Sequence, residues 1–434
     1  MAFFVICYML INKKIILSIL LTIFLWNCSQ SSINNSINAI PVNYKTIFVK
    51  TGLDVLMENH LDKLYGRKVA LVTNQSGLDM YGVSNVSRFL ANDSINLVKI
   101  FTPEHGFTGM IADGEHIESE TTSTVLPPII SLYGKSRKPT LEMYKDIDLI
   151  IYDIQDVGTR VYTYISTLGL VMETAGEANI PVMILDRPNP IGNKVEGPVL
   201  DINHKSFIGQ YPIPVRYGMT IGELGKMIVG KKMINPISNL LVIPMENYKS
   251  NYLYDDTKLP WVKPSPNIVD LETSFTYPGL CLLQGTNVSD GRGTYKPLKR
   301  VGAPWINSEQ LINRLENEKL GGVNFTENKF TPVPLSSMSV SPKFQDRECF
   351  GVDLNITNRT LFNSVQTGII IIYHLNKMYP DSFSIKQKSI ARIWGSDNLY
   401  MQLQEGKTPT EIINSYQAEL EQFKLIREKY LIYK

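Results

Sequence analysis

Four short apolar runs, rich in β-branched residues, alternate with segments of helical periodicity in the first half of the chain. The runs are Val69–Thr73, Leu97–Thr102, Leu149–Ile154 and Val182–Asp186. None alternates strictly between polar and apolar residues, which predicts strands buried on both faces. Between the last two runs, Ile165, Leu168, Met172 and Ala175 recur at the spacing of a helix. The pattern predicts an α/β fold, a doubly wound parallel sheet with right-handed crossovers.

A second region is predicted to follow the proline-dense segment Leu259–Asn267. Its elements include a strand around Asn355–Thr357 and a buried helix over Gly368–Tyr379. Thr408 and Glu411 flank a first-turn proline and predict the start of a C-terminal helix. We therefore divide the folded part of the chain into residues 47–265 and residues 266–434.

The first 28 residues are typical of a lipoprotein signal peptide. Two lysines precede the apolar stretch Ile15–Trp26, and Cys28 follows it. Met9 is an alternative start to Met1. The stretch is too short to span a bilayer comfortably. We expect a lipid anchor on Cys28; a signal anchor and a free Cys28 are the alternatives.

Residues 29–46 are polar and nearly uncharged, which predicts a flexible tether. The protein is then expected in the periplasm or elsewhere in the cell envelope, held at a membrane. In such a compartment Cys281 and Cys349 could form a disulfide, and two buried free thiols are the alternative.

The composition excludes several classes of protein. With 434 residues, 44% of them hydrophobic, the chain can form more than one core. The net charge of +2, without long runs of like charge, gives no reason to expect nucleic acid as a partner. No CxxC pair is present, and the first apolar run leads into "TNQSGLD" rather than a glycine-rich phosphate loop. We expect no cofactor.

Every predicted strand of the first region ends in polar residues. These are Asn74 after the first strand, Glu104 and His105 after the second, Asp153 and Asp156 after the third, and Asp186, Arg187 and Asn189 after the fourth. The carboxyl ends of parallel strands meet at one edge, where α/β proteins bind their ligands. Any single cluster could be a cap or a loop, but four together predict a site.

Paired carboxyl groups in such a crevice suit the hydrolysis of a glycosidic bond. That reaction commonly uses one carboxylic acid and a second carboxylate as base or nucleophile, and burial raises the pKa of the acid. Glu104 in "PEHG" is our candidate acid, and Glu196 in "VEGPVLD" is the candidate partner. Glu115 and Glu118 are further candidates.

Three arginines and two tyrosines are candidates for binding a substrate. Arg160, Arg187 and Arg292 could grip a carboxylate, or each could form an internal salt bridge, such as that of Arg187 with Asp153 or Asp186. Tyr162 and Tyr164 could stack on a sugar or pack a helix.

A metal site is the weaker alternative. His105, Glu115, His116 and Asp153 could supply ligands, but their spacing matches no short zinc motif. We expect His105 to hydrogen-bond the substrate or to orient a carboxylate.

Nine distinctive blocks, in order from Leu53 to the C-terminus, resemble the exo-β-N-acetylmuramidases of the NamZ type. They include "VALVTNQSG", "FTPEHGFTG", "DIQDVGTRVYTYISTL", "LDRPNPIG", "FIGQYPIPVRYGMTIGELG" and "YPGLCLLQGTNVSDGRGT". The resemblance implies a Rossmann-like catalytic domain and a smaller α/β domain that completes the cleft. It also implies release of terminal β-linked N-acetylmuramic acid from the non-reducing end of peptidoglycan fragments during cell-wall recycling. The family's glutamates match Glu104 and, less closely, Glu196.

Gln284 and Asp290 stand where the family usually has glutamate. Gln284 supports a rival function, a non-catalytic lipoprotein that binds muropeptides or their disaccharides; a metal-dependent amidase is a third possibility. The lactyl carboxylate of N-acetylmuramic acid explains an arginine in the crevice. The sequence leaves open whether Glu196 attacks or activates water, or whether the acetamido group of the substrate attacks with Asp153 or Asp156 orienting it.

Overall fold

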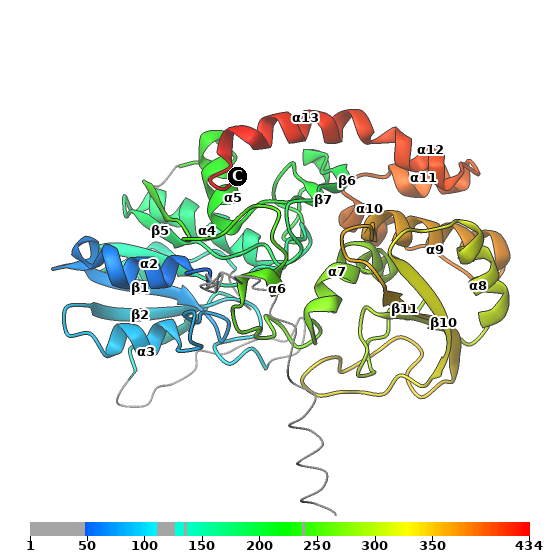
Figure 1. The fold of residues 1–434 in the computed structure, drawn as a ribbon, viewed down its shortest axis with the longest axis horizontal. Coiled ribbons are helices and arrows are strands. Elements are labelled where there is room, and N and C mark those ends of the chain that lie inside the picture. Colours follow the sequence, from blue (N-terminus) through cyan, green and yellow to red (C-terminus); the bar gives the residue numbers. More distant parts are fainter. Residues whose placement is uncertain (1–47, 111–125, 134–136, 237–238) are drawn as a thin grey trace, which may run out of the picture. The chain divides into compact units, whose positions relative to one another are not determined.

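A six-stranded parallel sheet forms the first half of the protein. The computed structural model describes residues 48–110, 126–133, 137–236 and 239–434 (Figure 1), and Phe48–Lys434 is one compact unit. The strands are β1 (Lys68–Thr73), β2 (Asn96–Thr102), β3 (Ile129–Ser131), β4 (Leu149–Asp153), β5 (Val182–Leu185) and β8 (Leu240–Ile243). Their order in the sheet is β3-β2-β1-β4-β5-β8, with every neighbouring pair parallel. The predicted α/β fold is confirmed, and so are all four predicted strands.

Helices cover both faces of this sheet because its strands are apolar on both sides. In β1, Val69 and Leu71 belong to one core cluster, whereas Ala70 and Val72 belong to the other. The first cluster packs under α2 (Gly52–Asn59) and α3 (Asn85–Leu90). The second packs under α4 (Tyr164–Glu177) and α5 (Ile221–Gly230). Continuous apolar runs therefore marked doubly covered strands, as the sequence predicted.

The second half is built around an antiparallel sheet in the order β10-β11-β9. Its strands are β9 (Arg300–Ala303), β10 (Val323–Phe330) and β11 (Cys349–Ile356). Helices α7 (Leu271–Leu280), α8 (Ser308–Asn317), α9 (Ser364–Met378), α10 (Gln387–Trp394) and α11 (Asn398–Gln404) belong to this half. The predicted strand at Asn355–Thr357 is the end of the longer β11, and the predicted helix at Gly368–Tyr379 begins four residues earlier, after the cap Asn363.

Several shorter elements lie between or beside these helices and strands. They are the antiparallel pair β6 (Glu196–Val199) and β7 (Pro214–Arg216), helix α6 (Tyr254–Thr257), and the 3-10 turns η1 (Leu61–Leu64), η2 (Leu141–Tyr144), η3 (Ile202–His204), η4 (Cys281–Gly285) and η5 (Glu428–Tyr430).

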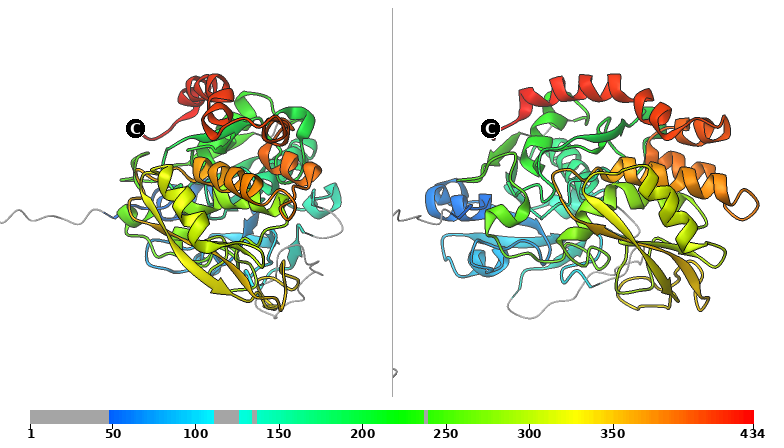
Figure 2. Two further views of the ribbon diagram at one scale, coloured as in Figure 1. Left: turned by 90° about the vertical axis from the view of Figure 1, so that its right-hand side faces the viewer. Right: turned by 45° about the vertical axis from the view of Figure 1, so that its right-hand side comes forward.

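The last helices bring the chain back to the parallel sheet. The predicted capping box of Thr408 and Glu411 starts α12 (Pro409–Ser415), but the helix breaks at Tyr416 before α13 (Gln417–Arg427). Helix α13 then runs back toward α5 (Figures 1 and 2). The hydroxyl of Tyr433 donates to Asp186 Oδ2 at 2.7 Å, which fixes the C-terminus against the end of β5.

Two further sequence predictions concern the cysteines and the N-terminal segment. Cys281 and Cys349 are both buried free thiols, so the disulfide is not formed and the alternative holds. The signal peptide, Cys28 and the tether lie outside the described residues. Among the residues that are described, no helix is both long enough and apolar enough to cross a membrane.

Arg160 joins the β6–β7 pair to the second half. Its side chain is fully buried, and its two terminal nitrogens donate to four carbonyl oxygens. Nη1 bonds Pro198 O and Ile213 O, both at 2.8 Å, and Nη2 bonds Ile393 O at 2.9 Å and Trp394 O at 2.7 Å. The last two end α10, where the helix dipole favours a cation. Burial lowers the pKa of Arg160 to about 10, so the guanidinium stays charged at neutral pH.

We predict that Arg160→Lys destabilises the protein. A compact ammonium has three donors and cannot span four carbonyls from two directions, so the free energy of unfolding should fall by about 2 kcal/mol or more. Urea denaturation measures the change. The matched control is Arg314→Lys on the exposed face of α8, which should lie within about 0.5 kcal/mol of the parent. Equal stability of the two variants would contradict the assigned role.

Candidate functional site

A cavity of about 180 Å³ lies beside the end of β2 and is lined by both halves of the chain. The first half contributes the turn after β2, the residues before α4, and Ile208; the second contributes the segment around α7, η4, a glycine-rich loop and the end of α10. The lining residues are Glu104, His105, Val161, Tyr162, Thr163, Ile208, Ser265, Asn267, Ile268, Tyr277, Cys281, Gln284, Arg292, Leu298 and Ile393.

A tight turn presents Glu104 and His105 to this cavity. Gly106 N donates to Pro103 O at 3.2 Å, and both His105 (φ 74°) and Gly106 (φ 73°) are left-handed. A left-handed conformation costs a residue with a side chain on the order of 1 kcal/mol or more. Such strain is often retained at functional sites because it places a side chain where no relaxed turn would.

Neighbouring hydroxyl groups hold the carboxylate of Glu104. Thr163 Oγ1 donates to Glu104 Oε2 at 2.7 Å. Tyr133 lies close by, and burial, followed by the negative charge of Glu104, raises the pKa of this tyrosine to about 12. Tyr133 therefore remains a neutral donor at physiological pH. Glu104 is half-buried and lines the cavity, where Thr163 fixes its carboxyl group.

Arg292 reaches the cavity from a loop of the second half. The flanking glycines Gly291 (φ 81°) and Gly293 (φ 80°) adopt backbone conformations that other residues rarely allow. A side chain on Gly291 would also collide with Arg300. Arg292 Nε lies 3.8 Å from Asp290 Oδ2, so the buried Asp290 orients the guanidinium. Gln284, on η4, lines the same cavity.

Most of the polar residues predicted at the strand ends bond one another instead of lining the cavity. Arg187 Nε donates to Asp153 Oδ1 at 2.5 Å, and its Nη2 donates to Leu78 O at 2.9 Å. Asn85 Nδ2 donates to the other carboxylate oxygen of Asp153 at 2.8 Å. Asp153 and Arg187 are both buried, so this pair is the internal salt bridge that the sequence left as the alternative.

Asn74, Asn189 and Asp156 are also occupied within the protein. Asn74 Nδ2 donates to Tyr164 Oη at 2.9 Å, and Asn189 Nδ2 donates to Met219 O at 2.9 Å. Asp156 accepts from Gly158 N at 2.7 Å and from the hydroxyl of Tyr217. Burial raises the pKa of Asp156 to about 6. None of the three lines the cavity, so their surroundings do not fit direct substrate contact.

Glu196 is not brought together with Glu104. It lies on β6, outside the parallel sheet, and only 3% of it is exposed. Arg216 Nη1 donates to its Oε1 at 2.6 Å, and Val365 N, in the first turn of α9, donates to its Oε2 at 3.2 Å. A carboxylate there neutralises an arginine and stabilises a helix start. These contacts do not support the expected catalytic partnership of Glu196 with Glu104. The substrate contact expected of Arg160 is likewise unsupported, because its terminal nitrogens donate to carbonyl oxygens.

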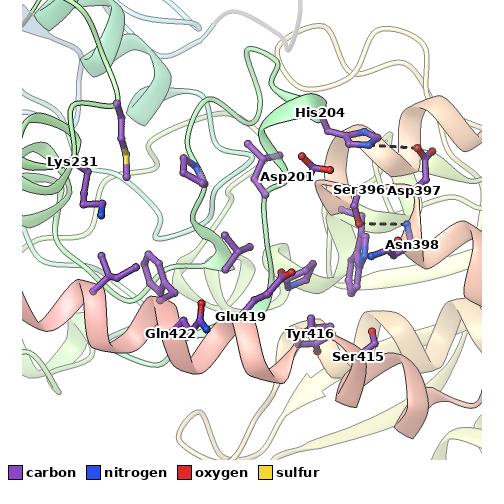
Figure 3. A pocket seen from close by; sticks show the side chains of 18 of the residues that line it. Asp201, His204, Lys231, Ser396, Asp397, Asn398, Ser415, Tyr416, Glu419 and Gln422 are labelled. Atoms are coloured by element: carbon purple, nitrogen blue, oxygen red, sulfur yellow. Dashed lines mark hydrogen bonds and ion pairs between the residues drawn. The ribbon is translucent and has the colours of Figure 1, made fainter.

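A second cavity is larger, about 700 Å³, but has less suitable chemistry. It lies between the β6 region, α10, α11 and α13 (Figure 3). Trp394, Tyr416 and Phe423 contribute apolar surface, and His204 pairs with Asp397 at 3.4 Å. Within the described part of the chain, its lining includes no arginine and no candidate site residue predicted from the sequence. We therefore take the smaller cavity as the candidate site.

Several lining residues were not predicted as site residues. Ser265 and Asn267 belong to "KPSPN", which was interpreted only as a boundary; Thr163 and Tyr277 carried no distinct signal. The high proline content of that segment was the one sequence feature that could have indicated a rigid cavity wall.

The structure describes only some of the residues that were considered as metal ligands. Glu115, His116 and Glu118 lie outside the described residues. Among the residues that have been placed, no three histidine, cysteine, aspartate or glutamate side chains are grouped to hold an ion.

Comparisons with known proteins point to one family. The model of the N-terminal part of the exo-β-N-acetylmuramidase NamZ matches residues 69–272, and the model of its C-terminal part matches residues 275–433. The peptidoglycan β-N-acetylmuramidase NamZ of Bacillus subtilis (strain 168) is 41% identical over 387 residues, covering 89% of this chain and 91% of the relative. Two crystal structures of DUF1343 family proteins from Bacteroides fragilis NCTC 9343 are also similar over 89% of this chain. They have TM-scores of 0.82 and 0.70, with 33% and 31% identity, over 100% and 99% of their own chains.

We predict that ionisation of Asp186 lowers the free energy of unfolding as the pH rises. Burial and the nearby charge of Glu223 raise its pKa to about 7, from about 4 in an unfolded chain. The folded protein therefore keeps this proton to a higher pH than the unfolded chain, and the free energy of unfolding should fall between about pH 4 and 7. Asp186→Asn should remove that fall, because an amide nitrogen at Oδ2 can donate to the hydroxyls of Thr220 and Tyr433.

Thermal unfolding between pH 5 and pH 8 tests this prediction. The control is Asp353→Asn. Burial opposes ionisation of Asp353, but hydrogen bonds from Arg300 and Lys296 outweigh it and lower its pKa. Asp353 is therefore ionised in the folded and the unfolded chain throughout this pH range, and its substitution should cost a similar amount of stability at every pH tested. If Asp186→Asn and the parent showed parallel pH dependence, the proton assigned to Asp186 would be wrong.

Proposed function

The chain belongs to the NamZ exo-β-N-acetylmuramidase family, and from this premise we propose that it is a glycosidase acting on peptidoglycan fragments. The bond hydrolysed is that of a terminal β-linked N-acetylmuramic acid residue at the non-reducing end. The observation that carries the proposal is one small cavity that contains both Glu104 and Arg292. The carboxyl group can supply the proton for cleavage, and the guanidinium can bind the carboxylate of this sugar.

Glu104 is proposed as the general acid. Its carboxyl group would donate a proton to the glycosidic oxygen as the bond from C1 to that oxygen breaks, and the oxygen of a water molecule would form the new bond to C1. The proton that this water releases replaces the one given up by Glu104. The hydrogen bond from Thr163 Oγ1 holds the carboxyl group in place at the cavity. The strained turn at His105 supports this role, because it keeps the carboxyl group at the cavity wall.

Arg292 is proposed to bind the lactyl carboxylate, which distinguishes N-acetylmuramic acid from other amino sugars. A guanidinium can donate two parallel hydrogen bonds to a carboxylate. His105 lines the same wall as Glu104 and is proposed to contact a sugar hydroxyl. Because the cavity, at about 180 Å³, is smaller than common ligand pockets of about 300–1,000 Å³, it suits the end of a chain better than its middle.

The proposal gives Glu196, Asp153 and Asp156 structural roles. Each is buried and bonded to neighbours in the protein, at a place that the cavity does not reach. No role for these three in attacking C1, or in orienting the acetamido group, is supported by their surroundings.

The cellular setting follows the sequence. We propose a lipoprotein anchored through Cys28 and tethered by residues 29–46, acting in the periplasm or cell envelope on disaccharides or larger muropeptides. The division into residues 47–265 and 266–434 is part of the proposal, and the cavity lined from both sides of that boundary supports it.

The rival, a muropeptide-binding protein without activity, draws on Gln284, a neutral amide in the cavity. Incubation with a chromogenic β-N-acetylmuraminide separates the two: release of the chromophore supports the glycosidase, and tight binding without release supports the rival.

We predict that Glu104→Gln removes hydrolysis while leaving substrate binding. An amide keeps the shape but has no acidic proton to donate, so kcat should fall by about 10² or more. The comparison variant is Glu196→Gln, which weakens a buried ion pair and should lower the melting temperature. Folded Glu196→Gln should keep most of its kcat. Near-normal turnover by Glu104→Gln, or loss of turnover in well-folded Glu196→Gln, would contradict the assignment.

A further inference from the structure

The hydroxyl group of Tyr162 is poorly satisfied by the described residues. The residue lines the Glu104 cavity and is 6% exposed. Its Oη is buried and meets no described partner at normal hydrogen-bond geometry. The hydroxyl groups of Ser265 and Tyr164 lie close enough to affect the pKa of Tyr162. Buried hydroxyl groups without well-placed partners are uncommon in folded proteins, so this one is a candidate to bind a substrate group.

The ring of Tyr162 is held in place by its neighbours. It packs edge-on against Tyr164, with ring centroids 4.6 Å apart, and against Tyr277 at 6.1 Å. The hydroxyl of Tyr164, by contrast, is used within the protein, since it donates to Pro264 O at 2.6 Å and accepts from Asn74 Nδ2 at 2.9 Å. Burial raises the pKa of Tyr162 well above 10, so its hydroxyl keeps its proton and can donate.

The position of Tyr162 identifies the part of the sugar that it would meet. The next residue, Thr163, holds the carboxyl group of Glu104. If Glu104 protonates the glycosidic oxygen on C1, a donor in the same cavity can reach the substituent of C2, which in N-acetylmuramic acid is the acetamido group. Gln284 lines this cavity too, and its amide offers both a donor and an acceptor, the complement of an acetamide.

We propose that Tyr162 donates a hydrogen bond to the carbonyl oxygen of the 2-acetamido group and so selects N-acetylated sugars. This inference rests on the proposed function, because it takes Glu104 to mark C1. Arg292 then binds the lactyl carboxylate and Tyr162 binds the N-acetyl group, which makes the cavity specific for both substituents. A site built to hydrogen-bond a substrate group discriminates strongly against the analogue that lacks it.

The test is Tyr162→Phe, which keeps the packed ring and removes only the hydroxyl. Because that hydroxyl has no well-placed partner among the described residues, the melting temperature should change little or rise. Affinity for N-acetylmuramic acid, measured by calorimetry, should fall about tenfold. Affinity for the analogue with a hydroxyl in place of the acetamido group should change little. Equal losses for both sugars, or no loss for either, would overturn the proposal.

Tyr144→Phe is the matched control. Tyr144 is a buried tyrosine away from the cavity, and its hydroxyl donates to Val171 O at 3.3 Å. This variant should lose some thermal stability and bind both sugars as the parent does. Since the readout is binding, it does not depend on turnover: a parent that binds and discriminates the two sugars without hydrolysing would refute the proposed function but not the role of Tyr162.

Discussion

The guanidinium of Arg160 is the interaction on which the candidate site depends. It bonds carbonyls of the β6–β7 region with one nitrogen and the last carbonyls of α10 with the other. The next residues, Val161–Thr163, form one wall of the cavity, and Ile393, whose carbonyl Arg160 binds, lines it as well. Arg160 has no carboxylate partner among the described residues. It therefore holds these two walls through hydrogen bonds to backbone carbonyl oxygens alone. Arg160 therefore shapes the cavity through the backbone that it holds.

A buried ion pair lies at the carboxyl edge of the parallel sheet. Counted along the chain, the six strands lie in the order 3-2-1-4-5-6, and the reversal between β1 and β4 is the usual ligand crevice of such sheets. Here the pair of Asp153 and Arg187, with Asn85, occupies that place. The candidate cavity lies instead beside the end of β2, and Glu104 and His105 line it.

The sequence predicted the sheet well and the site only in part. Strands such as β1 and β4 were recognisable because a short, uninterrupted apolar run must be covered on both faces to be kept from water. The strand-end polar residues were predicted to share one edge, but not whether they would face a ligand or each other. Asp153 and Arg187 satisfy one another, and Glu196 satisfies Arg216, through contacts far apart in sequence that no local pattern records. For the same reason, the sequence did not predict that residues between Asn267 and Arg292 form a cavity wall, although Arg292 itself was predicted as a site residue.

The central claim is that two halves of the chain bring one acid and one arginine to a cavity for a single sugar. A crystal structure with bound N-acetylmuramic acid tests it most directly. We expect the sugar beside Glu104, with its anomeric oxygen within hydrogen-bonding distance of that carboxyl group and its lactyl carboxylate on Arg292. A sugar bound instead in the cavity of about 700 Å³ under α13, or bound beside Glu104 with its carboxylate turned away from Arg292, would contradict the claim.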